Sequence, residues 1–275
     1  MHAIEFYKMS GCGNDFIVID NRAAVVDEAQ LKKFIVNVCR RKMSVGADGL
    51  ILVEDSQTAD FSWRFFNSDG SRGEMCGNGA RCVARFAQLT GIAGPRLTFE
   101  TEAGPIQAAV NNGRVRIRMT EPSPLGAEFQ LDIGTTLLSV QTVNTGVPHA
   151  LIEVADVDSV TVVEQGRAIR HHPAFAPAGT NVNFVCPRAD GTLAVRTYER
   201  GVEDETLACG TGAVASALLM AAKYGRRGPI RVLTRSGGHL EVHFEARDGG
   251  FENVHLEGDA RVICVGRMEV SAWEY

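Results

Sequence analysis

Cys76-Gly-Asn-Gly-Ala80 is repeated as Cys209-Gly-Thr-Gly-Ala213, 133 residues later in the chain. Three further pairs of segments repeat at the same offset: Gly13–Asp20 with Gly146–Glu153, Val45–Leu52 with Ala178–Val185, and Thr101–Gly104 with Thr234–Gly237. One match alone carries little weight, but a single register that holds over roughly ninety residues indicates an internal duplication.

The duplication predicts an α/β fold, in the α+β sense, built from two similar halves. We expect the halves at residues 1–120 and 121–260, with a last strand within 261–275 that crosses back to the first half. Two such halves pack most naturally about a pseudo-twofold axis. A cleft between domains is a common place for a small-molecule site, so we expect the active site there.

Local patterns predict the elements of the first half. Apolar runs and alternations predict three strands, at residues 16–20, 50–54 and 61–66. Residues 27–40 read as a helix, because apolar residues recur at helical spacing from Leu31 onward and Asp27 can cap the first turn. Asn112-Gly113, between two apolar runs, predicts a β-hairpin.

The bulk composition excludes several classes of protein. The net charge is −5 and Lys and Arg never form a basic run, so nothing indicates a nucleic-acid partner. The apolar stretch Ala213–Ala222 is too short to span a membrane, and the N-terminus lacks the pattern of a signal peptide. Seven cysteines, an odd number without zinc-ligand spacing, fit free thiols in a reducing cytoplasm and no bound metal.

Each repeated motif follows a strand–turn segment and precedes a helical pattern, so Cys76 and Cys209 are expected at helix starts. The glycines let the backbone approach a ligand closely, and the N–H groups of the first turn suit a carboxylate. The positive end of the helix dipole, formed by these N–H groups, also lowers the pKa of a thiol from about 8.5 to about 7 or below. One such cysteine suggests a nucleophile, whereas two related ones suggest a base on one face of a carbon and an acid on the other.

This cysteine pair predicts inversion at the α-carbon of an amino acid. One thiolate removes the α-proton and the opposite thiol returns a proton from the other face. We expect no cofactor, so the carbanion must be stabilised by oriented N–H dipoles in a dry site rather than by pyridoxal phosphate. The glycine clusters also lack the context of a nucleotide-binding motif.

With these motifs in place, the chain resembles the diaminopimelate epimerase family from end to end. The segments that carry the resemblance are Met9–Phe16, Phe66–Ser71, Cys76–Cys82, Glu199–Gly201, Glu205-Thr206 and Ala208–Gly212. The resemblance implies two halves, each a mixed sheet curled around a central helix, in a cytoplasmic homodimer. It also implies a small-molecule substrate, the interconversion of LL- and meso-2,6-diaminopimelate, and a place in lysine and peptidoglycan precursor synthesis.

The resemblance assigns roles to individual residues. Cys76 and Cys209 would be the acid/base pair, and His149 and Glu199 would lie near them and tune their pKa values. The substrate-binding residues that it implies are Asn14, Asn67, Asn181, Glu199 and Arg200, together with the first-turn residues Gly77, Asn78, Gly210 and Thr211, whose amides would hold the reacting carboxylate.

Four further positions bear on the substrate-binding residues that the resemblance implies. Val147 and Gly49 stand where many or some family members carry Asn or Gln, so each removes a polar contact at the distal end of the substrate. Asn183 is expected to serve the opposite face of the strand from Asn181. The place of Cys12 in a glycine-rich loop leaves its role open.

Other functions fit parts of the pattern. A proline or hydroxyproline racemase would use the same two thiols, but the additional Asn, Glu and Arg residues favour a substrate with a second amino-acid head. A thiol–disulfide redox protein would also carry two reactive thiols that oxidise to a disulfide. A non-catalytic amino-acid-binding module would need neither cysteine.

Overall fold

The computed structural model describes residues 3–134 and 136–275, and the chain divides into two units. Unit 1 comprises Met1–Ile117 and Gly258–Tyr275, and unit 2 comprises Arg118–Glu257. The first unit therefore ends at residue 117, where the sequence led us to expect 120. No helix in the described part of the chain is long and apolar enough to cross a membrane.

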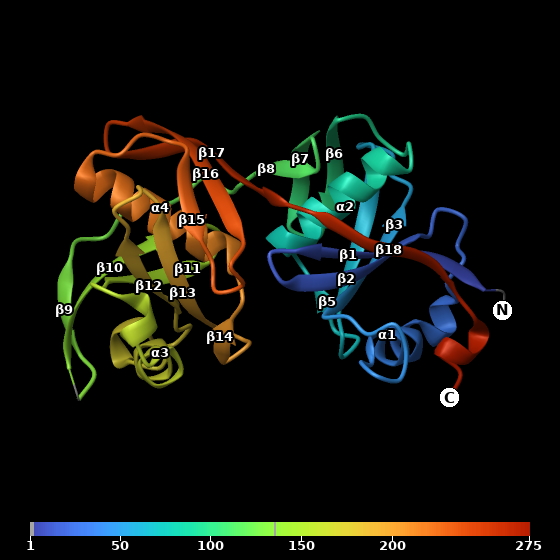
Figure 1. Cartoon of the computed structure of the whole chain (residues 1–275), viewed down its shortest axis with the longest axis horizontal. Helices are drawn as coiled ribbons and strands as arrows, with labels where there is room; N and C mark the ends of the chain where they lie inside the picture. The colour runs from blue at the N-terminus through green and yellow to red at the C-terminus, as the bar shows by residue number, and fades with distance from the viewer. Residues whose placement is uncertain (1–2, 135) are drawn as a thin grey trace. The chain divides into compact units, whose positions relative to one another are not determined.

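Unit 1 is a mixed sheet with two α-helices. Its elements are β1 (Ile4–Gly11), β2 (Asn14–Asp20), the 3-10 helix η1 (Glu28–Gln30), α1 (Leu31–Cys39), β3 (Gly49–Glu54), β4 (Phe61–Asn67), β5 (Arg72–Gly73), α2 (Gly77–Leu89), β6 (Arg96–Thr101), β7 (Gly104–Asn111), β8 (Arg114–Arg118), β18 (Arg261–Met268) and η4 (Val270–Ala272). β18 pairs antiparallel with β1, and Figure 1 shows the red C-terminal strand beside the blue N-terminal one. The last strand of the chain thus completes the sheet that the first strand begins.

Unit 2 repeats this order of elements. Its elements are β9 (Phe129–Asp132), β10 (Leu137–Asn144), β11 (Pro148–Glu153), η2 (Val157–Ser159), α3 (Val162–Arg170), η3 (Pro173–Phe175), β12 (Asn181–Pro187), β13 (Leu193–Glu199), β14 (Asp204–Thr206), α4 (Gly210–Tyr224), β15 (Ile230–Leu233), β16 (His239–Arg247) and β17 (Gly250–Asp259). β10 lies 133 residues after β1, and α4 begins 133 residues after α2. The duplication seen in the sequence is therefore a duplication of structure.

The strand pairing is the same in both units. In unit 1, β1–β2, β3–β4, β6–β7 and β7–β8 are antiparallel, whereas β2–β3 and β4–β6 are parallel. In unit 2, β10–β11, β12–β13, β15–β16 and β16–β17 are antiparallel, and β11–β12 and β13–β15 are parallel. Parallel neighbours need a crossover, which α1 and α2 supply in unit 1 and α3 and α4 supply in unit 2.

Each sheet curls around one helix and carries the other helix on its opposite face. α2 contacts β1, β2, β3 and β7, and α4 contacts strands from β10 to β16. In β3, Leu50 and Leu52 pack in one cluster with Phe34 and Ile35 of α1, whereas Ile51 lies beside Gly79 of α2. The strand is buried on both faces, which explains its unbroken apolar sequence.

Most local predictions are confirmed, with one shift. The three predicted strands are β2, β3 and β4, and the hairpin turns at Asn112 and Gly113, both with positive φ as a type I′ turn requires. The predicted helix at residues 27–40 is divided. Asp27 accepts a hydrogen bond from the Ala29 N–H at 2.9 Å and caps η1, after which α1 runs from Leu31 to Cys39.

Close packing of α3 on β13 gives a test of the fold of unit 2. A Cβ at Gly166 would lie 2.4 Å from the Cβ of Tyr198, which is fully buried. Gly166→Ala should therefore lower the free energy of unfolding by ~1–3 kcal/mol, although Ala favours a helix over Gly. Denaturant unfolding measures this. Gly250→Ala is the control, because a Cβ there meets nothing within 4 Å, and equal effects of both variants would contradict the packing described.

Candidate active site

Cys76 and Cys209 are the N-cap residues of α2 and α4. Both have extended backbones, with φ of −143° and −111°, and the first helical hydrogen bonds run from Ala80 N–H and Ala213 N–H to the two cysteine carbonyls. The predicted helix starts are therefore confirmed. The first N–H groups of an α-helix have no acceptor within the helix and are available to a side chain or a ligand at its N-terminus.

In unit 2 the sulfur itself caps the helix. Cys209 Sγ accepts a hydrogen bond from the Gly212 N–H at 3.4 Å and lies 3.4 Å from Thr211 Oγ1. Thr145 Oγ1 donates to the Thr211 carbonyl at 3.2 Å and holds this turn. A donor aimed at sulfur favours the thiolate over the thiol.

Three glycines of the two motifs have close neighbours, most of all Gly212. A Cβ at Gly212 would lie 2.3 Å from Asn183 Oδ1, and a Cβ at Gly210 would lie 2.9 Å from Leu256. At Gly79, the counterpart of Gly212, a Cβ would lie 3.3 Å from Ile51. The first turn of each helix therefore packs closely against its sheet, directly after the cysteine.

In unit 1 the structure joins two predicted binding residues in a polar chain. Asn78 Nδ2 donates to Asn14 Oδ1 at 2.6 Å, and Asn14 Nδ2 donates to Asp48 Oδ2 at 3.1 Å. Arg41 anchors the other oxygen of Asp48 at 2.8 Å. The amides of Asn14 and Asn78 are therefore held in one orientation beside the start of α2.

Asn67 lies at the end of β4, opposite Gly49 in the ladder. Its exposed amide donates to Ser71 Oγ at 3.0 Å and closes the turn between β4 and β5. Gly49 has no room for a side chain, because a Cβ would lie 2.6 Å from the Phe66 carbonyl oxygen. A Gln at this position would require the two strands to separate.

In unit 2 the predicted residues Asn181 and Arg200 are in direct contact. Asn181 Oδ1 accepts a hydrogen bond from the Arg200 N–H at 2.8 Å, and Asn181 Nδ2 donates to the Pro148 carbonyl at 3.2 Å. Asn181 lies beside His149 in the parallel pairing of β11 and β12. Val147 directly precedes β11, at the position that matches Asn14 in unit 1.

Asn183 corrects one expectation. Residues two apart in a strand point to the same face, so Asn183 shares the face of Asn181 rather than the opposite one. It is fully buried beside Gly212, accepts from Thr197 Oγ1 at 2.9 Å, and donates through Nδ2 to His149 Nδ1 at 2.9 Å. The period of two in the sequence was a sufficient signal for this placement.

His149 is a neutral imidazole in a buried site. Burial, followed by the charge of Arg200, lowers the pKa of His149 to about 3. Because Asn183 donates to Nδ1, the ring proton is on Nε2, and this buried N–H has no partner among the described residues. His149 thus offers a hydrogen-bond donor and no positive charge.

Burial raises the pKa of Glu199, the last residue of β13. The carboxyl group is therefore closer to protonation at neutral pH than an exposed one. A carboxyl group with a raised pKa is suited to exchange a proton with a neighbouring acid or base.

The remaining thiols do not share these surroundings. Cys12 has a left-handed backbone with φ of 52°, and its Sγ donates to Asp259 Oδ1 at 3.3 Å. Burial raises the pKa of Cys12 to about 11 and that of Cys39 to about 12, and it also raises the pKa of Cys82. These three thiols remain protonated at neutral pH.

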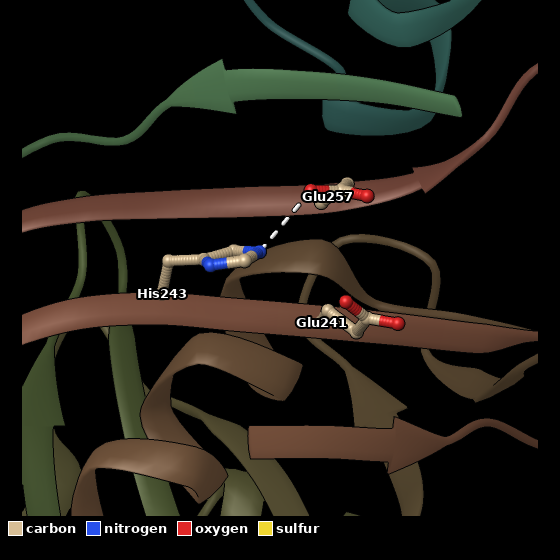
Figure 2. Close-up of side chains that lie close together, drawn as sticks. All are labelled: Glu241, His243 and Glu257. Carbon is tan, nitrogen blue, oxygen red and sulfur yellow. Dashed lines mark ion pairs between the residues drawn. The ribbon is translucent and has the colours of Figure 1, made fainter. Parts of the chain in front are cut away.

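Unit 2 also carries a cluster of Glu241, His243 and Glu257 on β16 and β17, whose donor atoms lie within 4.8 Å of one another. Figure 2 shows His243 Nε2 directed at Glu257, 3.2 Å away, with Glu241 beside them. Each of the three makes a further interaction in the chain. Since the three side chains interact with one another and with other residues of the chain, we assign the cluster no metal and no part in the reaction.

A cavity of about 610 Å³ lies in unit 1 beneath the C-terminal residues. Phe34 of α1, Trp273 and Tyr275 form much of its wall. None of the candidate residues lines it. The cavity is therefore not part of the candidate site.

The neutrality of His149 predicts a pH effect on stability. In the unfolded chain His149 binds a proton near pH 6.5, but in the folded chain only near pH 3. The unfolded state then holds more protons between these values, so the free energy of unfolding decreases as the pH falls below about 6.5, by at most about 1.4 kcal/mol per pH unit. Denaturant unfolding of wild type and His149→Gln between pH 4 and 7 measures the difference. The wild type should lose stability faster, and parallel curves would contradict a neutral His149.

Several curated proteins of similar sequence are described as diaminopimelate epimerases. A diaminopimelate epimerase of Aquifex aeolicus is 47% identical over 99% of this chain and 100% of its own length. Diaminopimelate epimerases of Chlorobaculum tepidum (43% identical, 94% of this chain, 99% of its own) and Archaeoglobus fulgidus (38% identical, 99% of each) match similarly. These matches cover both units and both cysteine motifs.

Solved structures support the fold at much lower sequence identity. A phenazine biosynthesis protein of the PhzF family from Bacillus anthracis has a TM-score of 0.74 at 17% identity, over 98% of this chain and 100% of that one. A probable proline racemase from Agrobacterium radiobacter has a TM-score of 0.70 at 16% identity, over 97% and 93%. The model of the family described as diaminopimelate epimerase matches residues 6–124 and 141–262, and the chain belongs to that family.

Proposed function

We propose that this protein interconverts LL- and meso-2,6-diaminopimelate by a two-base reaction in which Cys76 and Cys209 exchange a proton with the α-carbon. The observation that carries the proposal is the duplicated N-cap cysteine, each followed by a glycine-rich first turn. A lone activated thiol suits nucleophilic attack, whereas a duplicated one suits removal of a proton on one face and its return on the other.

In this reaction the two cysteines take up one proton and release one. One cysteine begins as thiolate and the other as thiol; the thiolate takes the α-proton and the thiol gives its proton to the opposite face of the carbanion. The first-turn amides of Gly77, Asn78, Gly210 and Thr211 supply N–H dipoles for the substrate carboxylate, on which the negative charge develops. Such dipoles are most effective where water is excluded.

The polar residues around the two motifs would hold the remainder of the substrate. Asn14, Asn67 and Asn181 offer amides, and Glu199 with Arg200 offers a charge of each sign for the distal amino and carboxyl groups. Since His149 is neutral, it would assist Cys209 through its Nε2–H rather than through charge. Val147 contributes no polar group, so recognition of the distal centre would rest on the other residues.

We further propose that the reaction proceeds without pyridoxal phosphate or a metal and takes place in the cytoplasm. The free thiols of the chain are compatible with a reducing compartment. The product would then feed the synthesis of lysine and of peptidoglycan precursors.

The proposal predicts exchange of the α-proton without any additive. Purified protein in deuterated water should incorporate deuterium at the α-carbon of diaminopimelate, as followed by NMR. Cys76→Ser and Cys209→Ser should each lower the rate of epimerisation about 10²-fold or more, because general acid–base groups contribute that much. The control is Cys186→Ser, which replaces a thiol outside both motifs.

Three results would count against the proposal. Exchange of proline but not of diaminopimelate would indicate a proline racemase. Full epimerisation in both cysteine variants would exclude the two-base reaction. Absence of epimerisation in fully reduced enzyme, combined with reversible formation of a Cys76–Cys209 disulfide, would favour a redox protein.

We also propose that the protein is a homodimer that uses the surface of β18. Ile263 and Val265 on this strand are 57% and 53% exposed, and apolar side chains exposed on a strand are commonly covered by another chain. A second copy is the occupant that the family resemblance favours.

The double variant Ile263→Lys/Val265→Lys should shift the protein from dimer to monomer, because four added charges would face each other across the interface. Light scattering after size-exclusion chromatography measures the mass. Leu137→Lys, at an apolar residue of unit 2 that is 63% exposed, is the control. A monomeric wild type, or a double variant that remains dimeric, would contradict this interface.

A further inference from the structure

Arg81 is a fully buried cation in the second turn of α2, five residues after Cys76. Its Nη2 donates to Asn78 Oδ1 at 2.8 Å, its Nη1 to the Gly77 carbonyl at 3.2 Å, and its Nε to the Asp259 carbonyl at 3.2 Å. Two of these three acceptors belong to the first turn of α2. The guanidinium therefore lies at the same helix start as the Cys76 thiol.

The charge of Arg81 is not neutralised by its hydrogen bonds. All three acceptors are neutral oxygens, and the nearby Asp259 carboxylate is engaged by Arg261 at 3.0 Å and by Cys12. A buried guanidinium remains protonated, and burial of an uncompensated charge is costly. An anion at the start of α2 relieves that cost.

Three thiols lie in this region, and two of them cannot serve as the anion. Burial raises the pKa of Cys12 to about 11 and also raises that of Cys82, although Arg81 opposes both increases. Cys76 is only partly buried and occupies the N-cap, where the helix dipole also favours an anion. Cys76 is therefore the thiol of this region that can respond to the guanidinium.

The second motif has an apolar residue at the position equivalent to Arg81. Val214 occupies the position of Arg81 at the 133-residue offset and is fully buried, and Thr211 occupies that of Asn78. Among the described residues of unit 2, His149 lies beside Asn183, which borders Gly212 of the second motif, and is neutral. Burial raises the pKa of Glu199, and the charge of Arg200 acts on His149. The two copies of the motif thus differ by one buried positive charge.

We propose that Arg81 is a positioning residue that makes Cys76 the thiolate-bearing member of the cysteine pair in the resting enzyme, and that orients the Asn78 amide toward Asn14. The first role rests on the proposed function only in that the thiolate is the base of the reaction. No group is transferred to Arg81. It acts through the charge state of Cys76 and through the hydrogen bond that fixes which end of Asn78 faces Asn14.

Two substitutions of Arg81 distinguish its effect on the charge state of Cys76 from its effect on the orientation of Asn78. Arg81→Met removes the charge and the hydrogen bonds but keeps the volume, so the pKa of the Cys76 thiol should increase by about one unit, the shift expected for a charge roughly one helical turn away. Arg81→Lys keeps the charge but loses the planar fork. It should leave the thiol pKa near that of the wild type and increase KM several-fold, because the amides of Asn78 and Asn14 are no longer fixed.

The first measurement needs no substrate. The rate of alkylation by iodoacetamide, followed residue by residue by mass spectrometry of peptides between pH 5 and 10, gives the pKa of Cys76 and of Cys209 in the same sample. Cys209 is the internal control, and its pKa should not increase together with that of Cys76. Arg85→Met is the matched variant, because Arg85 lies one turn further along α2 and donates to the Ala260 carbonyl.

The second measurement is the pH profile of kcat/KM with diaminopimelate. Its acidic limb should move to higher pH in Arg81→Met together with the Cys76 alkylation profile, since both report the first deprotonation of the coupled pair. An unchanged Cys76 pKa in Arg81→Met, or equal shifts at Cys76 and Cys209, would overturn the proposal. An inactive wild type would refute the proposed function alone, because the alkylation result would still decide the role of Arg81.

Discussion

The position of a sulfur atom at a helix N-cap is the constraint on which the rest of the structure depends. A cysteine at the next position in the chain would point about 100° further around the helix axis, away from the first-turn amides. The chain fixes this position in both units by the same means. In each unit a strand is followed by a short antiparallel strand and then by the helix. Glycines in the first turn let the helix pack closely against the sheet, most closely where Gly212 meets Asn183.

The duplication preserves this backbone arrangement while the polar surroundings differ. In unit 1, Asn78 and Asn14 are tied to Asp48, and a buried guanidinium stands behind the helix start. In unit 2, Thr197, Asn183 and His149 form a chain of neutral groups that ends in an Nε2–H. Cys76 therefore lies near a buried positive charge, whereas Cys209 lies among neutral hydrogen-bond donors. The two thiols differ in their electrostatic surroundings although their backbones are alike.

The sequence predicts the elements and the helix starts well, because these follow from local rules. The Asn112-Gly113 turn, the strands of the first half and the N-cap cysteines depend on short patterns and on the 133-residue repeat. Side-chain partners are harder to predict, because they depend on which faces meet. The face of Asn183 follows from strand periodicity, but its bond to His149 requires the parallel pairing of β11 and β12. The neutrality of His149 likewise follows from burial, which a sequence does not report for a single polar residue.

The contrast among the seven cysteines shows why location decides the chemistry of a thiol. Cys82 shares helix α2 with Cys76, but it is fully buried and burial raises its pKa. Cys12 shares the neighbourhood of Arg81, yet burial and, to a smaller extent, its hydrogen bond to the Asp259 carboxylate raise its pKa and keep it a thiol. A nearby cation is thus insufficient where burial or an acceptor favours the protonated form. Among the cysteines that the structure describes, Cys76 and Cys209 lie at helix N-caps, where backbone donors and the helix dipole favour an anion, and the fold provides that position twice.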